Sequence, residues 1–220
     1  MVKKIFCAIA LTLCVVGVSA QDSDDKKNVV LVYAGPQLSS ASTGGVSAKF
    51  SFLGGVQYER NSVFGEGFGL FGGLEYTAKG TKDFTWLDGG KGDFNLNFLQ
   101  LNLGVKYERE IWGFQGFGQV GPYAAFGIGG KTKFRGIEVK SFESLHAETN
   151  GSYITYYDDG GAGFKKFDYG LRFALGAEYK GFRLTLGYQL GLADIADKQF
   201  ISNGYKNNGF FASLGYGFKF

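Results

Sequence analysis

The sequence predicts an all-β chain that folds as an eight-stranded antiparallel up-and-down transmembrane β-barrel. Three observations lead to this prediction. The 220 residues include 37 Gly and 17% aromatic residues but only 2 Pro, a composition typical of sheets with close backbone approaches. About eight stretches alternate apolar and polar residues, which is the period of strands with two different faces. The connections between these stretches alternate in length, as in a meander whose turns of one kind all lie at one end.

The first twenty residues carry the features of a secretory signal peptide. Lys3 and Lys4 precede an apolar stretch, 5–18, and small residues precede a cleavage position after Ala20. We therefore divide the chain into a signal peptide (1–20), a short charged leader (21–27) and a barrel domain (28–220).

Cleavage of the predicted signal peptide would change the composition of the mature chain and so exclude some classes of protein. Cys7 and Cys14 would leave with it, so the mature chain would form no disulfides. Loss of Lys3 and Lys4 lowers the formal net charge from +3 to +1, which leaves no basic field for nucleic acid. Outside the first twenty residues no apolar run is long enough for a membrane-spanning helix.

The first five alternating stretches are 29–38, 49–59, 68–77, 99–108 and 114–128. The first is apolar on both faces, and the next two alternate aromatic and aliphatic residues with charged, amide and small ones. The alternation slips at Phe98-Leu99, which predicts a β-bulge or a strand end there. In the fifth, Gln115 and Gln119 lie on the face opposite to Ile128.

The last three stretches are the most regular, and they are 167–179, 182–192 and 210–220. In a two-residue hairpin at Lys180-Gly181, Tyr179 would lie opposite Phe182. Glu178 would then lie opposite Arg183 on the other face. Aromatic meets aromatic and acid meets base, so the register is consistent across the turn.

The connections predict which ends of the barrel carry the loops. The long ones are 39–48, 80–92, 129–166 and 193–208, and the short ones are 60–65, 109–112 and 180–181. Because alternate connections of a meander share an end, one end carries only short turns and the other only long loops.

The composition of the two faces indicates which one points outward. A soluble barrel such as a lipocalin places its apolar face inward, and an outer-membrane barrel places it outward. The polar face here is rich in Gly, Ser, Thr, Gln and Asn, as suits a narrow interior, whereas a solvated face would carry more Lys and Glu. Trp86 and Trp112 lie just beyond strand ends, as in an aromatic girdle. These features favour the apolar-out arrangement.

Four short motifs carry a resemblance to a known family, and they are Gly121-Pro122-Tyr123, Phe167-Asp168-Tyr169-Gly170, 188–192 and 216–220. In this order they resemble the small eight-stranded outer-membrane β-barrels called porin-family or PorT-like proteins, over about residues 29–220. The resemblance implies a Gram-negative outer membrane of the Bacteroidetes type, with both termini periplasmic and the long loops extracellular. It also implies that the terminal alternation of Tyr216, Phe218 and Phe220 is an assembly signal. The family has no shared catalytic residues.

The inward face is predicted to carry a network of charges. Its members are Lys49, Glu59, Glu75, Lys106, Glu108, Asp168, Arg172, Glu178, Arg183 and Lys219. Five acids and five bases could line a narrow gated path for solutes. They could equally neutralise one another and plug the lumen, and we favour the plug because buried charges need partners.

The remaining candidate residues lie in the long connection 129–166. His146, the only histidine, has serines and acids nearby in the sequence, as a lipid-hydrolase triad would need. A triad is defined by its geometry in space, and neighbours within one loop do not supply that geometry. We therefore favour the interpretation that His146 is an exposed loop residue. One His and no mature Cys predict no metal site. Residues 131–140 alternate enough to extend a hairpin beyond the membrane. Tyr153, Tyr156 and Tyr157 suit protein or glycan recognition, or equally packing against neighbouring loops.

The sequence therefore leads to a function hypothesis with two alternatives. We expect a non-enzymatic outer-membrane barrel with a structural or interaction role, at the cell surface or as an accessory subunit of a larger complex. A narrow channel for ions or small solutes is the second hypothesis, and a lipid-modifying enzyme is the third. Expected partners are outer-membrane lipid and lipopolysaccharide, the barrel assembly machinery and other outer-membrane proteins, with no nucleic acid and no cofactor.

Overall fold

The computed structural model describes residues 27–42, 47–85, 91–134, 137–140, 146–149, 152–155, 164–196 and 204–220. The predicted signal peptide, both cysteines and residues 21–26 of the predicted leader lie outside these ranges. Among the described residues, no helix is long and apolar enough to cross a membrane.

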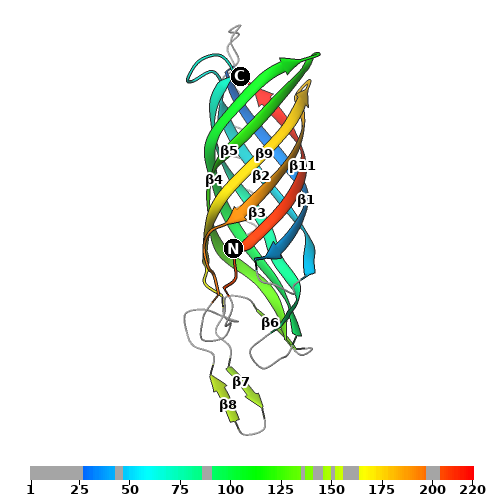
Figure 1. Cartoon of the computed structure of the whole chain (residues 1–220), viewed down its shortest axis with the longest axis vertical. Coiled ribbons are helices and arrows are strands. Elements are labelled where there is room, and N and C mark those ends of the chain that lie inside the picture. Colours follow the sequence, from blue (N-terminus) through cyan, green and yellow to red (C-terminus); the bar gives the residue numbers. More distant parts are fainter. Residues whose placement is uncertain are drawn as a thin grey trace.

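Eight strands form a closed antiparallel barrel (Figure 1). They are β1 (Asn28–Ala41), β2 (Ser47–Arg60), β3 (Phe68–Thr85), β4 (Lys91–Ile111), β5 (Phe114–Phe134), β9 (Phe167–Tyr179), β10 (Phe182–Gly191) and β11 (Asn207–Lys219). Each strand pairs with the next one around the ring, and β1 pairs with β11 to close it. The all-β, eight-stranded prediction is confirmed, and closure leaves the barrel without a free sheet edge.

The short connections lie at one end of the barrel, which we call the turn end (upper end in Figure 1). Between β9 and β10, Lys180 and Gly181 have φ of 49° and 86°, the positive values of a two-residue type I′ turn. Glu178 pairs with Arg183 across this turn, so the predicted register is confirmed. The backbones of Asn28 and Phe220 exchange hydrogen bonds at the same end.

The long connections leave from the opposite end, which we call the loop end (lower end in Figure 1). β3, β4 and β5 run further toward it than the alternation predicted. The extension of β5 pairs with β6 (Ile137–Lys140), so the predicted hairpin at residues 131–140 is confirmed. A separate two-stranded sheet, β7 (His146–Thr149) and β8 (Ser152–Thr155), lies beyond this end.

The irregularity predicted at Phe98-Leu99 is present, but it belongs to the neighbouring strand. The pairing of β4 with β5 shifts between Asn97 and Phe98, and the residue left over is Ile128 of β5. β4 itself keeps its alternation, with Phe94, Leu96 and Phe98 all buried. The apparent slip arises because the inward face becomes apolar near the loop end.

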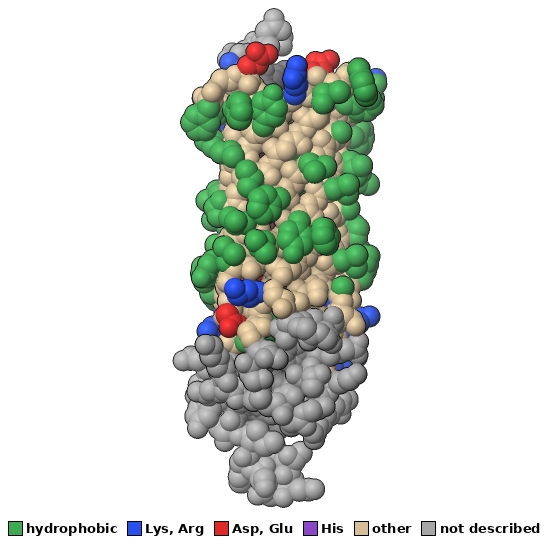
Figure 2. Space-filling model, viewed as in Figure 1, with side chains coloured by type: hydrophobic (Ala, Val, Ile, Leu, Met, Phe, Trp, Pro, Cys, Tyr) green, Lys and Arg blue, Asp and Glu red, His purple; other side chains and the backbone are tan. Residues whose placement is uncertain are grey.

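The two faces of the wall differ in chemistry. Large apolar side chains point outward around the barrel, and they include Phe52, Leu74, Leu101, Phe126, Leu175, Leu186 and Leu214. Figure 2 shows hydrophobic side chains covering the wall, with acidic and basic side chains gathered toward its two ends. The inward side chains are mostly polar and charged and are buried.

Candidate functional site

A cluster of charged side chains fills the lumen near the turn end, and its members are Glu59, Lys106, Glu108, Glu178, Arg183 and Lys219; we call it the turn-end cluster. Glu59 of β2 accepts hydrogen bonds from Lys106 Nζ at 2.6 Å and from Arg183 Nη2 at 3.0 Å, with Arg183 Nη1 also in contact. Gln57 and Gln119 donate to its Oε1 at 2.7 and 3.0 Å. One carboxylate therefore connects β2, β4, β5 and β10.

Arg183 links this cluster to Glu178 of β9, and Glu178 links it to Lys219 of β11. Its Nε and Nη2 donate to Glu178 Oε2 at 3.1 and 2.6 Å, and Lys219 Nζ lies 2.7 Å from Glu178 Oε1. The guanidinium carbon lies 4.7 Å from the centre of the Phe117 ring. Planar stacking and two carboxylate partners fit the guanidinium better than they would fit a lysine ammonium.

A second cluster, the middle cluster, surrounds Glu75 of β3. Arg172 Nη1 donates to both Glu75 oxygens at 2.8 Å, and the Tyr33 hydroxyl donates to Oε2 at 2.8 Å. Gln189 and Gln100 approach Oε1 at 3.3 and 3.5 Å. Glu75 is fully buried, so these donors replace the water that the carboxylate loses.

A third cluster, the loop-end cluster, surrounds Asp168 at the start of β9. Lys79 Nζ and Asn207 Nδ2 both lie 3.0 Å from Asp168 Oδ2. The Tyr123 hydroxyl lies 3.5 Å from both carboxylate oxygens, and the lysine ammonium lies 4.2 Å from the centre of the Tyr123 ring. The ammonium therefore has a carboxylate and an aromatic face as partners.

An apolar cluster fills the lumen beyond Asp168, and we call it the apolar stopper. Its members are Ala41, Phe94, Leu96, Phe98, Tyr123, Ala125, Phe164, Ala193, Ile195, Ala196 and Tyr205. The rings of Phe94 and Phe164 lie 4.5 Å apart, and those of Phe164 and Tyr205 lie 5.0 Å apart. Residues from two connections thus enter the mouth of the barrel and are fully buried there.

Backbone hydrogen bonds hold these two connections in the mouth. Lys165 N donates to Ile195 O at 2.8 Å, and Ile195 N donates to Tyr205 O at 3.0 Å. The Asp194 carboxylate accepts from Tyr205 N at 2.9 Å. The stopper is therefore attached to strands β9, β10 and β11.

Most residues of the predicted charge network lie in these clusters, but some lie apart from them or at the rim. Lys49 lies apart from the three charged clusters, and its ammonium donates to the backbone oxygen of Phe94 at 2.8 Å. Glu108 and Lys219 lie at the rim, where their side chains are 22% and 42% exposed. Sequence reasoning missed Lys79, which is 1% exposed. The signal that could have found it is the continued alternation of Thr77, Lys79 and Thr81, which had been assigned in part to a loop.

The predicted recognition and assembly residues lie elsewhere. His146 and Tyr153 belong to the small β7–β8 sheet, whereas Tyr156 and Tyr157 lie outside the described residues. Within the described part of the chain, no three potential ligands group to hold a metal ion. Tyr216 and Phe218 point outward with their ring centres 5.0 Å apart, and Phe220 follows the end of β11.

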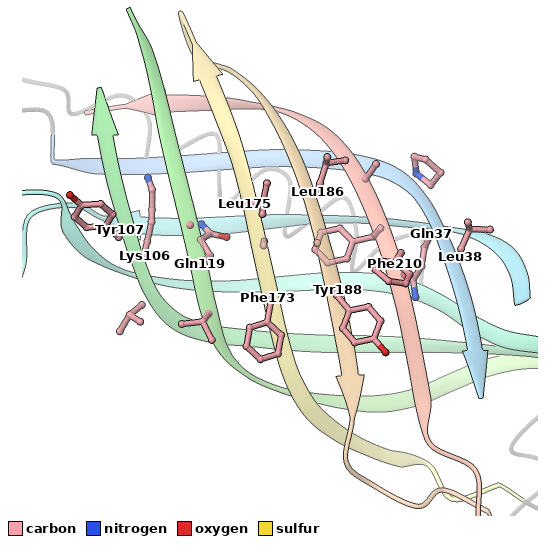
Figure 3. Close-up of a pocket in the computed structure, with 18 of the residues that line it drawn as sticks. Gln37, Leu38, Lys106, Tyr107, Gln119, Phe173, Leu175, Leu186, Tyr188 and Phe210 are labelled. Atoms are coloured by element: carbon pink, nitrogen blue, oxygen red, sulfur yellow. The ribbon is translucent and has the colours of Figure 1, made fainter. Parts of the chain in front are cut away.

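A shallow recess of about 1040 Å³ lies in the wall, lined mainly by residues of β1, β4, β5, β9, β10 and β11, with Phe50 of β2 and Phe68 of β3. Figure 3 shows outward side chains such as Tyr107, Phe173 and Leu186 along it, with Lys106 and Gln119 behind the wall. Most of its lining side chains are apolar, so it lacks the convergent polar groups that a site for polar chemistry needs.

A closed barrel with an apolar outer wall and a charged, filled lumen is the reverse of a soluble barrel, and it defines a transmembrane β-barrel. Residues 15–197 match the model of the family described as outer membrane protein beta-barrel domain. The chain belongs to this family, and it is an outer-membrane β-barrel protein.

Solved structures with similar folds include three bacterial barrels. Neisserial surface protein A is 13% identical with a TM-score of 0.47, and the match covers 88% of this chain and 97% of that one. OprG from Pseudomonas aeruginosa is 15% identical with a TM-score of 0.44, covering 88% and 96%. Ail, the attachment invasion locus protein of Yersinia pestis, is 14% identical with a TM-score of 0.44, covering 87% and 99%. No curated protein sequence matches this chain.

Proposed function

We propose that this protein is a closed, non-enzymatic outer-membrane barrel that acts through its surface, as a cell-surface interaction protein or as an accessory subunit of a larger outer-membrane complex. The observation that carries the proposal is the filled lumen. Three ion-paired clusters and the apolar stopper lie one after another along the axis, so the barrel wall and its loops are the parts left to make contacts.

The ion pairs within the lumen support a lumen closed by side chains over an open path for solutes. Glu59, Glu75, Asp168 and Glu178 each lie within 3.0 Å of a lysine or arginine nitrogen. Buried carboxylates held in this way resist displacement, because removal of one partner leaves the other as an uncompensated buried charge. A general pore would instead need charges that face open water.

One feature favours the second candidate, a narrow path for water or small ions. In the middle cluster, Gln100 Oε1, Asn102 Nδ2 and Gln189 Oε1 make no hydrogen bond to protein groups among the described residues. Polar atoms of this kind suit hydration, so this level of the lumen is the place where a solvated path would begin. The stopper beyond Asp168 separates that level from the loop end.

The proposal includes an orientation. With the long loops extracellular and both termini periplasmic, the β7–β8 sheet and residues Tyr153, Tyr156 and Tyr157 would face the medium. We propose these tyrosines as contact residues for a protein or glycan, because tyrosine offers a rigid amphipathic surface. Tyr216, Phe218 and Phe220 would serve the assembly machinery during insertion. The lipid-hydrolase hypothesis has only His146 to support it.

A deletion of residues 141–161 tests the interaction role. A matched control replaces the same segment with a Gly/Ser linker of equal length, and both proteins are compared with wild type by cross-linking in native outer membranes. We expect both variants to keep heat-modifiable gel migration and to lose the cross-linked partner. Cross-links that persist unchanged in both variants would exclude this segment as the contact surface.

A further inference from the structure

Three side chains of the loop-end cluster bring together an amine, a carboxylate and a carboxamide. They are Lys79 of β3, Asp168 of β9 and Asn207 of β11, and their exposed fractions are 1%, 0% and 2%. Lys79 Nζ and Asn207 Nδ2 each lie 3.0 Å from the same atom, Asp168 Oδ2. The two nitrogens are therefore no more than about 6 Å apart, a gap that rotation of the flexible lysine stem can close.

Aromatic and apolar groups surround these three side chains. The Lys79 ammonium lies 4.2 Å from the centre of the Tyr123 ring and 5.5 Å from the centre of the Phe98 ring. Both rings belong to the apolar stopper. Loss of water from such a site favours the neutral forms of an amine and a carboxyl group, and a neutral amine in an apolar pocket is a nucleophile.

The Lys79–Asp168 pair differs from the buried lysine pair of the turn-end cluster. Among the described residues, Lys79 is the one base within ion-pair distance of Asp168. Glu59, in contrast, faces both Lys106 and Arg183. A proton passed from Lys106 to Glu59 would leave Arg183 beside a neutral acid, whereas a proton passed from Lys79 to Asp168 leaves no unpaired charge. Proton transfer is therefore tolerated at the loop end and opposed at the turn end.

We propose that Lys79 and Asn207 become joined by an isopeptide bond, with Asp168 as the proton carrier. Asp168 takes one proton from the Lys79 ammonium, and the free amine attacks Cγ of Asn207. A bond forms between Nζ and Cγ, while the bond between Cγ and Nδ2 breaks. Asp168 passes its proton to the departing Nδ2, which leaves as ammonia, and then takes the second proton that Nζ loses.

The products suit the apolar surroundings better than the starting ion pair does. An amide and a protonated carboxyl group replace an ammonium and a carboxylate, so the three side chains end without charge. The reaction needs no other reactant and changes no oxidation state. The bond ties β3 to β11 across the lumen, two residues from Tyr205 of the apolar stopper. It is independent of the interaction role proposed for residues 141–161.

Peptide mapping by mass spectrometry tests this proposal on the full chain, purified from outer membranes. The bond lowers the mass by about 17 Da, the mass of ammonia, and trypsin then yields a branched peptide that joins Lys79 to Asn207. Cyclisation of Gln21 at the predicted mature terminus, or of the Asn208-Gly209 sequence, loses the same mass but leaves linear peptides. The branched peptide is therefore the readout.

Two variants test the roles of the side chains, and a third is the matched control. Lys79→Arg removes the nucleophile and Asp168→Asn removes the proton carrier, whereas Lys106→Arg replaces the buried lysine of the turn-end cluster. Heat-modifiable migration establishes that each protein is folded. We expect the branched peptide from wild type and Lys106→Arg, and only linear peptides from the other two. After boiling, the linked chains should also migrate faster on denaturing gels, because the bond keeps the unfolded chain compact.

The wild-type digest decides the proposal even where a variant does not fold. Only linear peptides at Lys79 and Asn207 would overturn it. A loss of about 18 Da with a branch at Asp168 would also overturn it, because Lys79 would then have condensed with the carboxyl group and released water. A branched peptide from folded Asp168→Asn would contradict the role of Asp168 as the proton carrier.

Discussion

Glu75 illustrates how single residues hold the lumen closed. Its carboxylate is fully buried and takes both of its main partners from distant strands, Arg172 from β9 and Tyr33 from β1. A side chain with such partners positions three strands at once. Its contribution lies in specifying the arrangement of the lumen, because a buried ion pair adds little net stability over a well-packed apolar one.

Substitution of Glu75 tests this at the residue scale. Glu75→Gln removes the counter-charge of Arg172, and we expect a loss of about 3–5 kcal/mol in the free energy of unfolding, measured by urea titration of the barrel in lipid vesicles. The exposed turn residue Glu66 gives the matched control, since Glu66→Gln should change stability by less than about 0.5 kcal/mol. A double variant, Glu75→Met/Arg172→Met, should recover much of the loss. Equal effects of the two glutamine variants would contradict the ion-pair account.

At this scale the sequence predicted which residues face inward better than it predicted their partners. Arg172 and Glu178 could be assigned from alternation alone, because each lies on a regular strand. Lys49 could not, since its contact with the Phe94 carbonyl depends on how β2, β3 and β4 meet at the loop end. Lys79 was missed because it lies between the predicted stretch, which ends at residue 77, and the predicted long connection, which begins at residue 80.

At the scale of single elements, the hairpins show how turn chemistry fixes strand register. Gly181 and Gly113 both have positive φ, at 86° and 80°. They differ in their surroundings, because a Cβ at Gly181 would lie 2.9 Å from the Tyr216 ring, whereas one at Gly113 would meet nothing within 4 Å. Comparing substitutions at these two glycines therefore distinguishes the cost of backbone strain from the cost of a steric clash.

Alanine at each of these glycines gives the second prediction. Gly113→Ala should lower the free energy of unfolding by about 1–2 kcal/mol through the left-handed backbone alone. Gly181→Ala should cost more, because the tyrosine ring must also move. Urea unfolding in lipid vesicles measures both, and a larger loss for Gly113→Ala would contradict the geometry of the β9–β10 turn.

The apolar stopper gives a third prediction. Phe164 is fully buried against the rings of Phe94 and Tyr205, so Phe164→Ala should cost about 3–5 kcal/mol through lost contacts and the cavity left behind. Phe64, which is 68% exposed in a turn, is the control, and Phe64→Ala should cost far less. Protease cleavage between β10 and β11 should accelerate in the first variant only. Similar cleavage in both variants would show that the stopper does not anchor these connections.

The apolar stopper is also the part of the lumen that the sequence patterns did not predict. Strict two-sided alternation predicts a polar inward face, so Phe98 beside Leu99 suggested a slip of phase. The inward face instead turns apolar where Phe164 and Ile195 arrive from distant connections. Single-strand patterns carry no information about residues that enter the lumen from elsewhere in the chain.

The whole molecule gives a prediction about orientation. If signal cleavage removes both cysteines, a single introduced cysteine reports its own side of the membrane. Ser47→Cys at the loop end should react with a membrane-impermeant maleimide on intact cells, and Glu66→Cys at the turn end should react only after lysis. The reverse pattern would place the termini outside.

At this scale, composition and alternation were sufficient for the closed barrel, because a membrane permits few architectures for strands. They were insufficient for function, since the role of such a barrel depends on loop contacts and on whether its lumen is open. The Lys180-Gly181 turn could be derived from local chemistry, whereas the closure of the lumen depends on contacts such as that of Lys79 with Asp168, 89 residues apart.

Single-channel recording in planar bilayers tests the closed lumen most directly. A variant that truncates all three charged clusters and the stopper together, Glu59→Ala/Arg183→Ala/Glu75→Ala/Arg172→Ala/Asp168→Ala/Phe164→Ala/Tyr205→Ala, shows that an opened barrel inserts and can be detected. We predict no sustained current steps for wild type, and resolved steps for this variant if it folds by heat-modifiable migration. Sustained steps from the wild-type barrel would contradict the plugged lumen and support a channel.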